Sequence, residues 1–377
     1  MYSVKGGHKM LRVSVSLLQP GMITAHNIYN SEGVLLVSAD RELDDQYVAR
    51  LKTLGLRSIY VKNMLYSGLE LPEDLLEEDD RRLLVKQVQQ VYKTFQENGQ
   101  IEIEPLKPRI NRLVSEIVRN RHMMVHFVDC RTNEDYLYAH VVNVAMMTVL
   151  VAATMEFNEE RLRDLAMGAV LHDIGEMLIP DEILNKPGKL TPAEWDVIHS
   201  HTTKGFEALR KVRDLSILSA HIAYQHHENF DGSGYPRKLA NDDIHEYARL
   251  SAIPNMFDAL ISDRPQRRGF LPHEAYELLM TLSGRYVDPY YLDAFLRTVA
   301  IYPIGSIVRL DSGEFGIVTK VLPRLQMRPT ISLLADPNGH PYPTPFEMDL
   351  TKNLTTQITK VLREEEVLFL SRSFKGI

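Results

Sequence analysis

The chain has 377 residues, of which 44% are hydrophobic and 25% are charged, and its formal net charge is −7. The length predicts two or three domains, and the composition is ordinary for a soluble globular protein. The negative charge disfavours binding to a nucleic acid polymer, because that partner needs a basic surface. The single cysteine, Cys130, excludes a disulfide within the chain and fits a reducing compartment.

The sequence predicts neither a signal peptide nor a membrane span. Its first residues, MYSVKGGHKMLRV, lack the apolar core of a signal peptide. The most apolar run, residues 141–155, is too short to cross a bilayer. We therefore expect a cytoplasmic protein.

Residues 1–70 predict a small α+β module. Residues 11–18 alternate like a strand and run into a turn, and residues 33–39 and 57–63 predict two more strands. Residues 43–55 predict a helix, because they have an Asp-rich start, helical apolar spacing and a glycine stop.

Residues 71–108 predict a charged helical linker. Leu84, Val88, Val91 and Phe95 recur at three- and four-residue steps, which is the spacing of one helix face. Two interpretations fit this stripe: the helix packs on its own domain, or it pairs with a second copy in a homodimer.

Residues 109–300 predict a helical bundle and residues 301–377 a small β-rich module, so the expected fold class is mainly α. Strand-like alternation is scarce in the first range, whereas residues 305–321 alternate and turn. The TPAEW stretch predicts a helix start, with Thr191 as the cap, Pro192 in the first position and Glu194 closing a capping box.

Seven of the fourteen histidines fall between residues 140 and 227. The informative positions lie about 25–35 residues apart, so a helical bundle can bring them to one place. Imidazole is a good ligand for divalent metals, and a carboxylate can bridge two ions. Any one of these histidines alone would be read as a surface or hydrogen-bonded core residue, but the set favours a metal site. The predicted metal ligands are His140, His172, Asp173, His201, His226 and His227.

The order of this series, with HDIG at 172–175 and HHENFDGSGYP at 226–236, resembles the HD-GYP domains. These domains are a branch of the HD-domain metal-dependent phosphohydrolases. The resemblance covers roughly residues 109–300 and continues through PDEILNKPGKLTPAEW and FDALISDRPQRR. It implies an HD-domain helical bundle, flanked here by the two small modules.

The resemblance implies hydrolysis of cyclic di-GMP to linear pGpG and sometimes to GMP. His140, His172 and Asp173 would hold one divalent metal, and Asp173, the expected catalytic carboxylate, would bridge to a second. The second would be held by His201, His226 and His227. Tyr136 stands where some relatives carry a glutamate for a third metal, so we expect two.

The metals are most often iron in this family, with manganese, zinc, nickel or cobalt as alternatives. Two-metal coordination lowers the pKa of a bound water from ~15.7 to about 7, which makes a metal-bridging hydroxide available to attack phosphorus at neutral pH.

Other residues of the resemblance would bind substrate or a partner. Arg264, Arg267 and Asp258 match positions near the substrate. A guanidinium suits a phosphate group, although a solvated basic turn also fits the arginines, and a purely structural role also fits Asp258. Gly234, Tyr235 and Pro236 form the GYP loop, which would shape the site entrance or a surface for a signalling partner.

Two positions depart from the family pattern. Glu176 stands where relatives carry a phosphate-binding lysine, and Asn255 stands where they carry a metal-binding aspartate. Glu176 follows His172 by four residues, so on a helix it could reach a metal and replace the lost carboxylate.

The departures leave competing functions. The leading hypothesis is a cyclic di-GMP phosphodiesterase. The alternative is a catalytically weak or inactive HD-GYP protein that acts as a cyclic-dinucleotide receptor or signalling partner. A hydrolase for another phosphorylated substrate is a third interpretation, which the DGSGYP loop disfavours.

Overall fold

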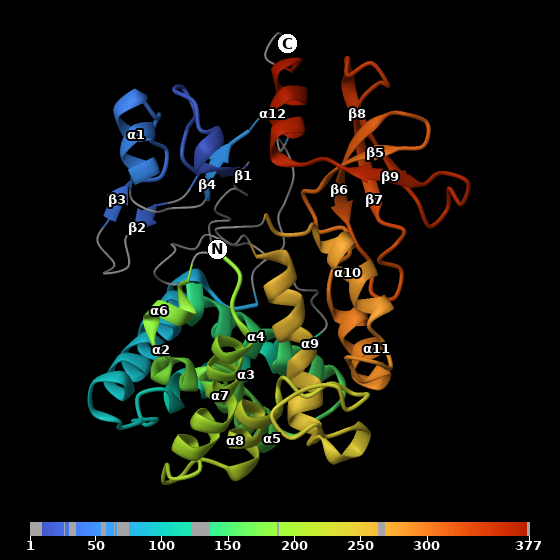
Figure 1. Cartoon of the computed structure of the whole chain (residues 1–377). Coiled ribbons are helices and arrows are strands. Elements are labelled where there is room, and N and C mark those ends of the chain that lie inside the picture. The colour runs from blue at the N-terminus through green and yellow to red at the C-terminus, as the bar shows by residue number, and fades with distance from the viewer. Residues whose placement is uncertain are drawn as a thin grey trace. The chain divides into compact units, whose positions relative to one another are not determined.

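The computed structural model describes residues 10–25, 27–29, 35–53, 58–63, 65, 75–121, 136–186, 188–262 and 268–374. The chain forms two compact units. The terminal unit combines residues up to 73 with residues from 300 onward, and the helical unit comprises residues 74–125 and 137–299. Helices dominate the middle of the sequence and strands occur near both of its ends (Figure 1).

The N-terminal part of the terminal unit pairs short strands around one helix. β1 (Met10–Ser14) is antiparallel to β4 (Ser58–Lys62), and β2 (Ile28–Tyr29) is antiparallel to β3 (Leu35–Val37). Helix α1 (Asp45–Thr53) connects β3 to β4 in the chain order. β1 is shorter than the alternating run that predicts it, because the backbone turns into a 3-10 helix, η1, at Val15–Leu17.

The C-terminal part of the terminal unit is a five-stranded antiparallel sheet followed by a helix, α12 (Glu364–Arg372). The strand order is β8-β7-β6-β5-β9. The strands are β5 (Ile307–Leu310), β6 (Phe315–Lys320), β7 (Thr330–Ala335), β8 (Pro341–Asp349) and β9 (Ile358–Val361).

These two parts share one hydrophobic core. Val13 and Val61, from the N-terminal strands, belong to the same buried cluster as Ile307 and Leu370 from the C-terminal part. The backbone N–H of Ser14 also donates to Glu364 Oε2 at 2.7 Å. The modules predicted at opposite ends of the sequence therefore bury apolar surface against each other.

The helical unit confirms the predicted mainly helical class. Its helices are α2 (Glu78–Asn98), α3 (Lys107–Arg119), α4 (Tyr136–Thr154), α5 (Glu159–Leu171), α6 (Asp181–Leu184), α7 (Pro192–Leu209), α8 (Ile217–Gln225), α9 (Glu246–Ile261), α10 (Pro272–Thr281) and α11 (Pro289–Thr298). Two 3-10 segments, η3 (Ile174–Leu178) and η4 (Asn241–Asp243), join them. The predicted capping box at the start of α7 is present, with Thr191 and Glu194 bonded reciprocally.

Helix α2 packs on its own unit. Leu84, Val88, Val91 and Phe95 are at most 4% exposed, so the apolar stripe is buried within the chain. The Tyr92 hydroxyl donates to the Val170 carbonyl at 3.0 Å, which ties α2 to α5. Of the two interpretations of this stripe, packing on its own domain is confirmed, and a homodimer would use another surface.

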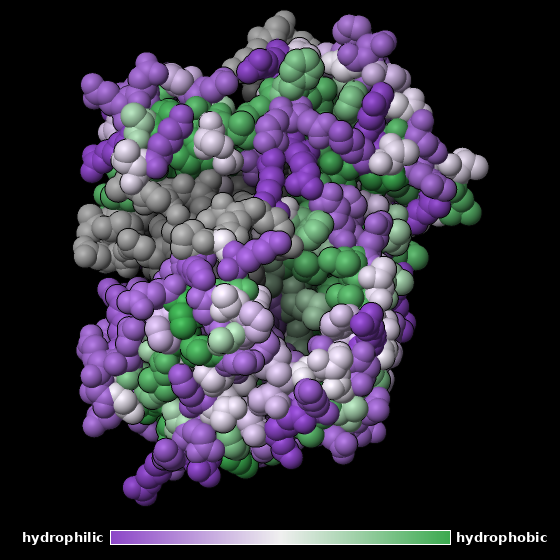
Figure 2. Space-filling view, in the orientation of Figure 1, coloured by the Kyte–Doolittle hydropathy of each residue, from purple (hydrophilic) through white to green (hydrophobic). Residues whose placement is uncertain are grey.

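Helix α4 is the apolar centre of the helical unit. It has 19 residues, because 136–140 extend the apolar run at 141–155, and it is long and apolar enough to cross a membrane. The expectation that this apolar run is too short to span a bilayer is therefore wrong for this helix. However, 89% of its most apolar window is buried inside the structure. Its apolar side chains are thus buried by packing against the rest of the chain. The face of the molecule drawn in Figure 2 is covered largely by hydrophilic residues with scattered hydrophobic patches.

Candidate metal centre

The predicted metal ligands come together from four places in the helical unit. His140 lies in α4, His172 and Asp173 lie at the junction of α5 and η3, and His201 lies in α7. His226 and His227 follow the last residue of α8, where the helix ends and both rings can turn toward the same space. The ligand atoms form two groups, in each of which they lie within 4.8 Å of one another. The groups are His140 with His172 and Asp173, and His201 with His226 and His227.

Three of the histidines have their Nδ1 atoms held by carbonyl oxygens of their own helix. A carbonyl only accepts, so each Nδ1 donates, and in the neutral ring the Nε2 atom then keeps its lone pair. This arrangement is typical of metal-binding histidines, whose outer nitrogen is oriented by a hydrogen bond. The Nδ1 partners are Ala169 O for His172 at 2.8 Å, Ile198 O for His201 at 2.7 Å, and Ile222 O for His226 at 3.0 Å.

Asp173 lies between the two groups, with one carboxylate oxygen facing each. Its Oδ2 lies 3.0 Å from His172 Nε2 and 3.9 Å from His140 Nε2. Its Oδ1 lies 3.3 Å from His226 Nε2 and 3.7 Å from His201 Nε2. This placement suits a carboxylate that bridges two cations. His172 Nε2 is buried and, among the described residues, has no partner with hydrogen-bond geometry, which leaves it available to a cation.

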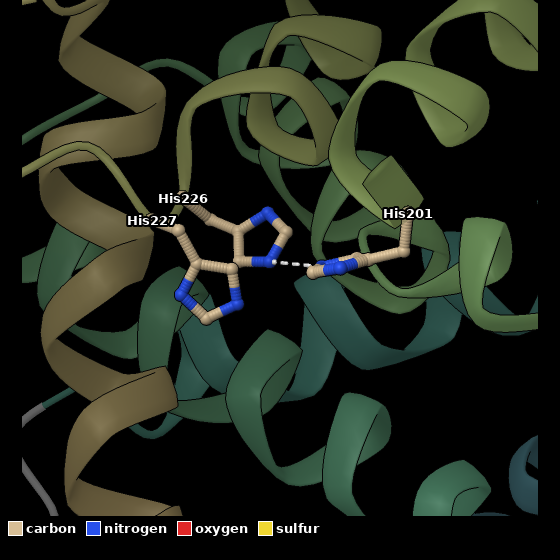
Figure 3. A group of neighbouring side chains, drawn as sticks. All are labelled: His201, His226 and His227. Carbon is tan, nitrogen blue, oxygen red and sulfur yellow. Dashed lines mark hydrogen bonds between the residues drawn. The ribbon is translucent and has the colours of Figure 1, made fainter. Parts of the chain in front are cut away.

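The second group brings two nitrogen lone pairs face to face. His201 Nε2 and His226 Nε2 lie 3.3 Å apart, and the rings of His226 and His227 both face His201 (Figure 3). With both Nδ1 atoms donating, these facing nitrogens repel each other unless a proton or a cation lies between them. The residues present therefore fit a divalent metal ion.

Burial sets the protonation of the second group. It lowers the pKa of His226 to about 4, although the adjacent Asp173 acts in the opposite direction. Burial also lowers the pKa of His201 and holds that of His227 well below its usual range. These rings are therefore neutral at pH 7, which is the form that binds a metal.

The pKa values of His172 and Asp173, which are both buried, shift in opposite directions. For His172, burial acts to lower the pKa, but the neighbouring Asp173 outweighs it and the pKa is raised. For Asp173, burial acts to raise the pKa, but His172 and His226 outweigh it and hold the pKa well below its usual range. Asp173 is thus ionised and can carry negative charge to both groups.

The position of Asp173 beside α7 depends on a close backbone contact. A Cβ added to Gly175, in η3, would lie 2.0 Å from the His201 carbonyl oxygen and 2.7 Å from Gly205 N. A Cβ on Gly205, across the same contact, would lie 3.3 Å from Gly175 N. Only glycine at 175 lets η3 approach α7 this closely.

The GYP loop braces His227. The Tyr235 ring stacks on the His227 ring, with centroids 4.8 Å apart, and on the His199 ring at 3.8 Å. Tyr235 N–H donates to the His227 carbonyl at 3.1 Å, and the Tyr235–Pro236 peptide is cis. A Cβ on Gly234 would lie 2.5 Å from that same carbonyl oxygen, so this position needs glycine.

Glu228 holds the same loop from inside. It is 3% exposed, and its two carboxylate oxygens accept from Arg237 N at 2.7 Å and from Leu239 N at 3.0 Å. The sequence leaves open whether Glu228 supports the site or is exposed, and the structure buries it behind the loop. The stacking of Tyr235 on His227 was not predicted, and its nearness to the His226–His227 pair was the available signal.

Asp258 and Asn255, both in α9, contact His140 from two sides. Asp258 Oδ2 lies 2.7 Å from His140 Nδ1, and Asn255 Oδ1 lies 2.9 Å from His140 Nε2. Asn143 Nδ2 donates to Asp258 Oδ1 at 2.9 Å. Asp258 is fully buried, so its place is behind His140 rather than against a substrate. Asn143, one turn after His140 in an otherwise apolar helix, is a second residue that sequence reasoning missed.

Glu176 belongs to neither group of ligand atoms. The α-helix ends at Leu171, so the α-helical spacing that would bring Glu176 beside His172 does not apply. Glu176 is half-buried. The pKa of Tyr235 is raised first by burial, then by the charge of Asp173 and then by the charge of Glu176. Arg264 and Arg267 lie outside the described residues.

Two family models match the chain. Residues 112–290 match the model described as HD domain, and residues 307–370 match the model described as KOW domain associated with HD domain.

Three curated proteins are among those with similar sequences. A cyclic di-GMP phosphodiesterase of Pseudomonas aeruginosa is 34% identical over 224 residues, which are 59% of this chain and 54% of that protein. A cyclic di-GMP phosphodiesterase of Thermotoga maritima is 36% identical over 48% of each chain. A 3'3'-cGAMP-specific phosphodiesterase of Vibrio cholerae is 34% identical over 63% of this chain and 43% of that protein. The chain thus spans about half the length of these relatives.

Proposed function

We propose that this chain, which matches the HD domain family through residues 112–290, is a member of its HD-GYP branch and a metal-dependent phosphodiesterase that hydrolyses cyclic di-GMP. The products would be linear pGpG and then GMP. The observation that carries the proposal is the buried Asp173, whose two oxygens face two separate histidine groups. The names of the relatives, which include cyclic di-GMP and cGAMP phosphodiesterases, support a cyclic dinucleotide as substrate.

The residues of the cluster have distinct parts in this proposal. When bound, two divalent metals would supply Lewis-acid chemistry and lower the pKa of a coordinated water. His140, His172 and Asp173 would hold one ion, and Asp173 would share the other with His201, His226 and His227. The fixed Nδ1 donors aim the ring nitrogens inward before any ligand arrives. Such preorganisation reduces the reorganisation that the reaction requires.

The finer features follow from the same proposal. We propose iron as the metal, since imidazole ligands suit iron and the HD-GYP resemblance favours it over manganese, zinc, nickel or cobalt. Arg264 and Arg267 would contact the substrate phosphates through their forked donors. A cytoplasmic location fits the single cysteine and the soluble character of the composition.

The GYP loop is the proposed surface for a signalling partner. The polar residues Asp231, Ser233, Arg237 and Lys238, which flank the GYP loop in the sequence, are exposed, whereas Gly234 within it is buried. The loop is also bonded to the metal-site residue His227, so a partner bound there would contact the segment that positions a ligand.

A reconstitution assay tests the proposal. The purified full chain is reduced, loaded with Fe²⁺ or Mn²⁺, analysed for metal content and incubated with cyclic di-GMP. We expect about two metals per chain, by the two-metal precedent, together with linear pGpG. Asp173→Asn is the control, because it removes the carboxylate that both groups share. Full metal occupancy without any linear product would refute the enzyme and favour the receptor.

One observation favours the receptor as second candidate. Asn255, a neutral residue, lies 2.9 Å from His140 Nε2, where the family pattern has a carboxylate. An amide is a weaker ligand than a carboxylate for a divalent ion. If this weakens turnover, Asn255→Asp combined with Glu176→Lys raises the hydrolysis rate. An unchanged rate in that double variant would remove these two positions as the cause of any weak activity.

A further inference from the structure

A line of hydrogen bonds connects helix α2 to the proposed metal centre. Arg81 Nη2 donates to Asn143 Oδ1 at 2.8 Å, and Asn143 Nδ2 donates to Asp258 Oδ1 at 2.9 Å. Asp258 Oδ2 then lies 2.7 Å from His140 Nδ1. Four side chains from α2, α4 and α9 thus form a continuous path that ends on a metal-site histidine.

Each bond in this path fixes the direction of the next. A guanidinium only donates, so Arg81 requires the oxygen end of the Asn143 amide. The amide nitrogen is then left to face Asp258 Oδ1, to which it donates. If the amide turned over, its oxygen would face the Asp258 carboxylate, and two acceptors would oppose each other in a buried place. Arg81 is therefore what selects the amide orientation that satisfies Asp258.

The position of Asp258 in turn orients the His140 ring. A carboxylate 2.7 Å from Nδ1 holds the ring so that Nε2 faces the group formed with His172 and Asp173, and Asn255 Oδ1 lies 2.9 Å from the same Nε2. Hydrogen bonds of this kind orient a ligand and raise its basicity, and their loss typically weakens metal binding about 10–100-fold.

We propose that Arg81 is a positioning residue for His140, acting through Asn143 and Asp258. Arg81 lies outside residues 112–290, so the helix that precedes the matched HD domain contributes to its metal site. The inference rests on the proposed metal centre and adds a residue of this chain to it.

The neighbouring Arg82 provides a matched control. It is on the same helix, its side chain is 45% exposed, and it donates to Asp79 at 3.0 Å, away from the Asn143 amide. Both arginines have the same helix propensity and charge, so a difference between their variants reports on the connection to His140.

The test measures metal affinity in the full chain without substrate. Mn²⁺ is titrated against a competing chelator for the wild type and for Arg81→Met, Arg81→Lys and Arg82→Met, and each thermal midpoint is recorded. We expect Arg81→Met to weaken one of the two metals about 10–100-fold and to leave the other in place. Arg81→Lys, which keeps a donor, restores most of that affinity, and Arg82→Met matches the wild type.

A second variant keeps the test informative if Arg81→Met does not fold. Asn143→Asp has the same shape and still accepts from Arg81, but it sets a carboxylate against Asp258, so the same metal should be weakened. Equal affinities in Arg81→Met and Arg82→Met would overturn the inference. So would equal weakening of both metals, or no restoration by Arg81→Lys, because both indicate packing alone. A wild type that binds no divalent metal would instead remove the proposed function itself.

Discussion

The contact between η3 and α7 gives the most direct prediction about the site, and Gly175→Ala is the change that tests it. The added methyl group would lie 2.0 Å from the His201 carbonyl oxygen, whereas ordinary contact begins near 3.4 Å. The difference, about 1.4 Å, has to come from separation of two backbones, because no flexible side chain is involved. Asp173 immediately precedes η3, so it moves away from His201 when the segments separate.

The size of the effect follows from this displacement. Overpacking a core typically costs about 1–3 kcal/mol, and a clash with backbone belongs near the upper value. For a domain of this size, about 3 kcal/mol corresponds to a thermal midpoint lower by roughly 6–12 °C. A reacting group misplaced by about 1 Å loses about 100-fold in rate. The distance between Asp173 Oδ1 and His201 Nε2, now 3.7 Å, would increase by a comparable amount.

The assay compares Gly175→Ala with Gly205→Ala, its partner across the same contact. A Cβ on Gly205 meets Gly175 N at 3.3 Å, which a shift of a few tenths of an ångström relieves. Thermal unfolding, metal content after dialysis and the rate of cyclic di-GMP hydrolysis are measured for both. We expect a large loss in all three for Gly175→Ala and a small one for Gly205→Ala. Equal behaviour of the two variants would refute the argument that this approach positions Asp173.

Three further predictions concern the same centre. Asp173→Asn should reduce the metal content, measured by elemental analysis, at both groups, because each has lost its shared negative oxygen. Tyr235→Ala should weaken metal binding about tenfold in a chelator titration, by loss of the ring that braces His227, whereas Tyr235→Phe keeps the stack. In the metal-free protein the pKa of His226 is lowered to about 4, against about 6.5 when unfolded, so the unfolded chain binds more protons between these values. The thermal midpoint of the metal-free protein should therefore fall as the pH is lowered from about 6.5 toward 4.

Each of these has an outcome that would contradict it. Loss of only one metal in Asp173→Asn would mean that the carboxylate does not bridge. Equal metal affinities in Tyr235→Ala and Tyr235→Phe would assign no role to the stacked ring. For the pH dependence, His226→Asn removes the titrating ring, so a slope as steep as that of the wild type would place the effect elsewhere.

The clustering of the candidate metal ligands could be predicted because their signal is chemical and local. His172–Asp173 and His226–His227 are unusual pairs inside apolar or glycine-rich sequence, and helical spacing accounts for their meeting. The residues that orient them carried weaker signals. Asp258 was expected near the substrate, because its sequence position does not reveal that α9 turns it behind His140. The expected reach of Glu176 assumed a continuous helix, which in fact ends before His172.

Long-range packing was the other limit of sequence reasoning. Strand and helix patterns predicted both end modules, but nothing local shows that Val13 and Ile307 belong to one core. The apolar stripe on α2 could not distinguish packing within the chain from dimerisation, because an apolar face has the same spacing whether it covers its own domain or a second copy. Only the buried positions of Val88 and Tyr92 decide between these.

The shared core of the terminal unit has a consequence for synthesis of the chain. Its N-terminal strands leave the ribosome first, but Ile307, Leu334 and Leu370 complete their core only after the helical unit has been made. At roughly 5–20 residues per second, the roughly 300 residues between β4 and Leu370 take about 15–60 s to make. The helical unit, contiguous apart from one segment, can fold during this wait, while the first strands keep their apolar faces exposed. In a newly made chain, the apolar faces of the N-terminal strands would thus depend on protection until the C-terminal part of the terminal unit has been synthesised.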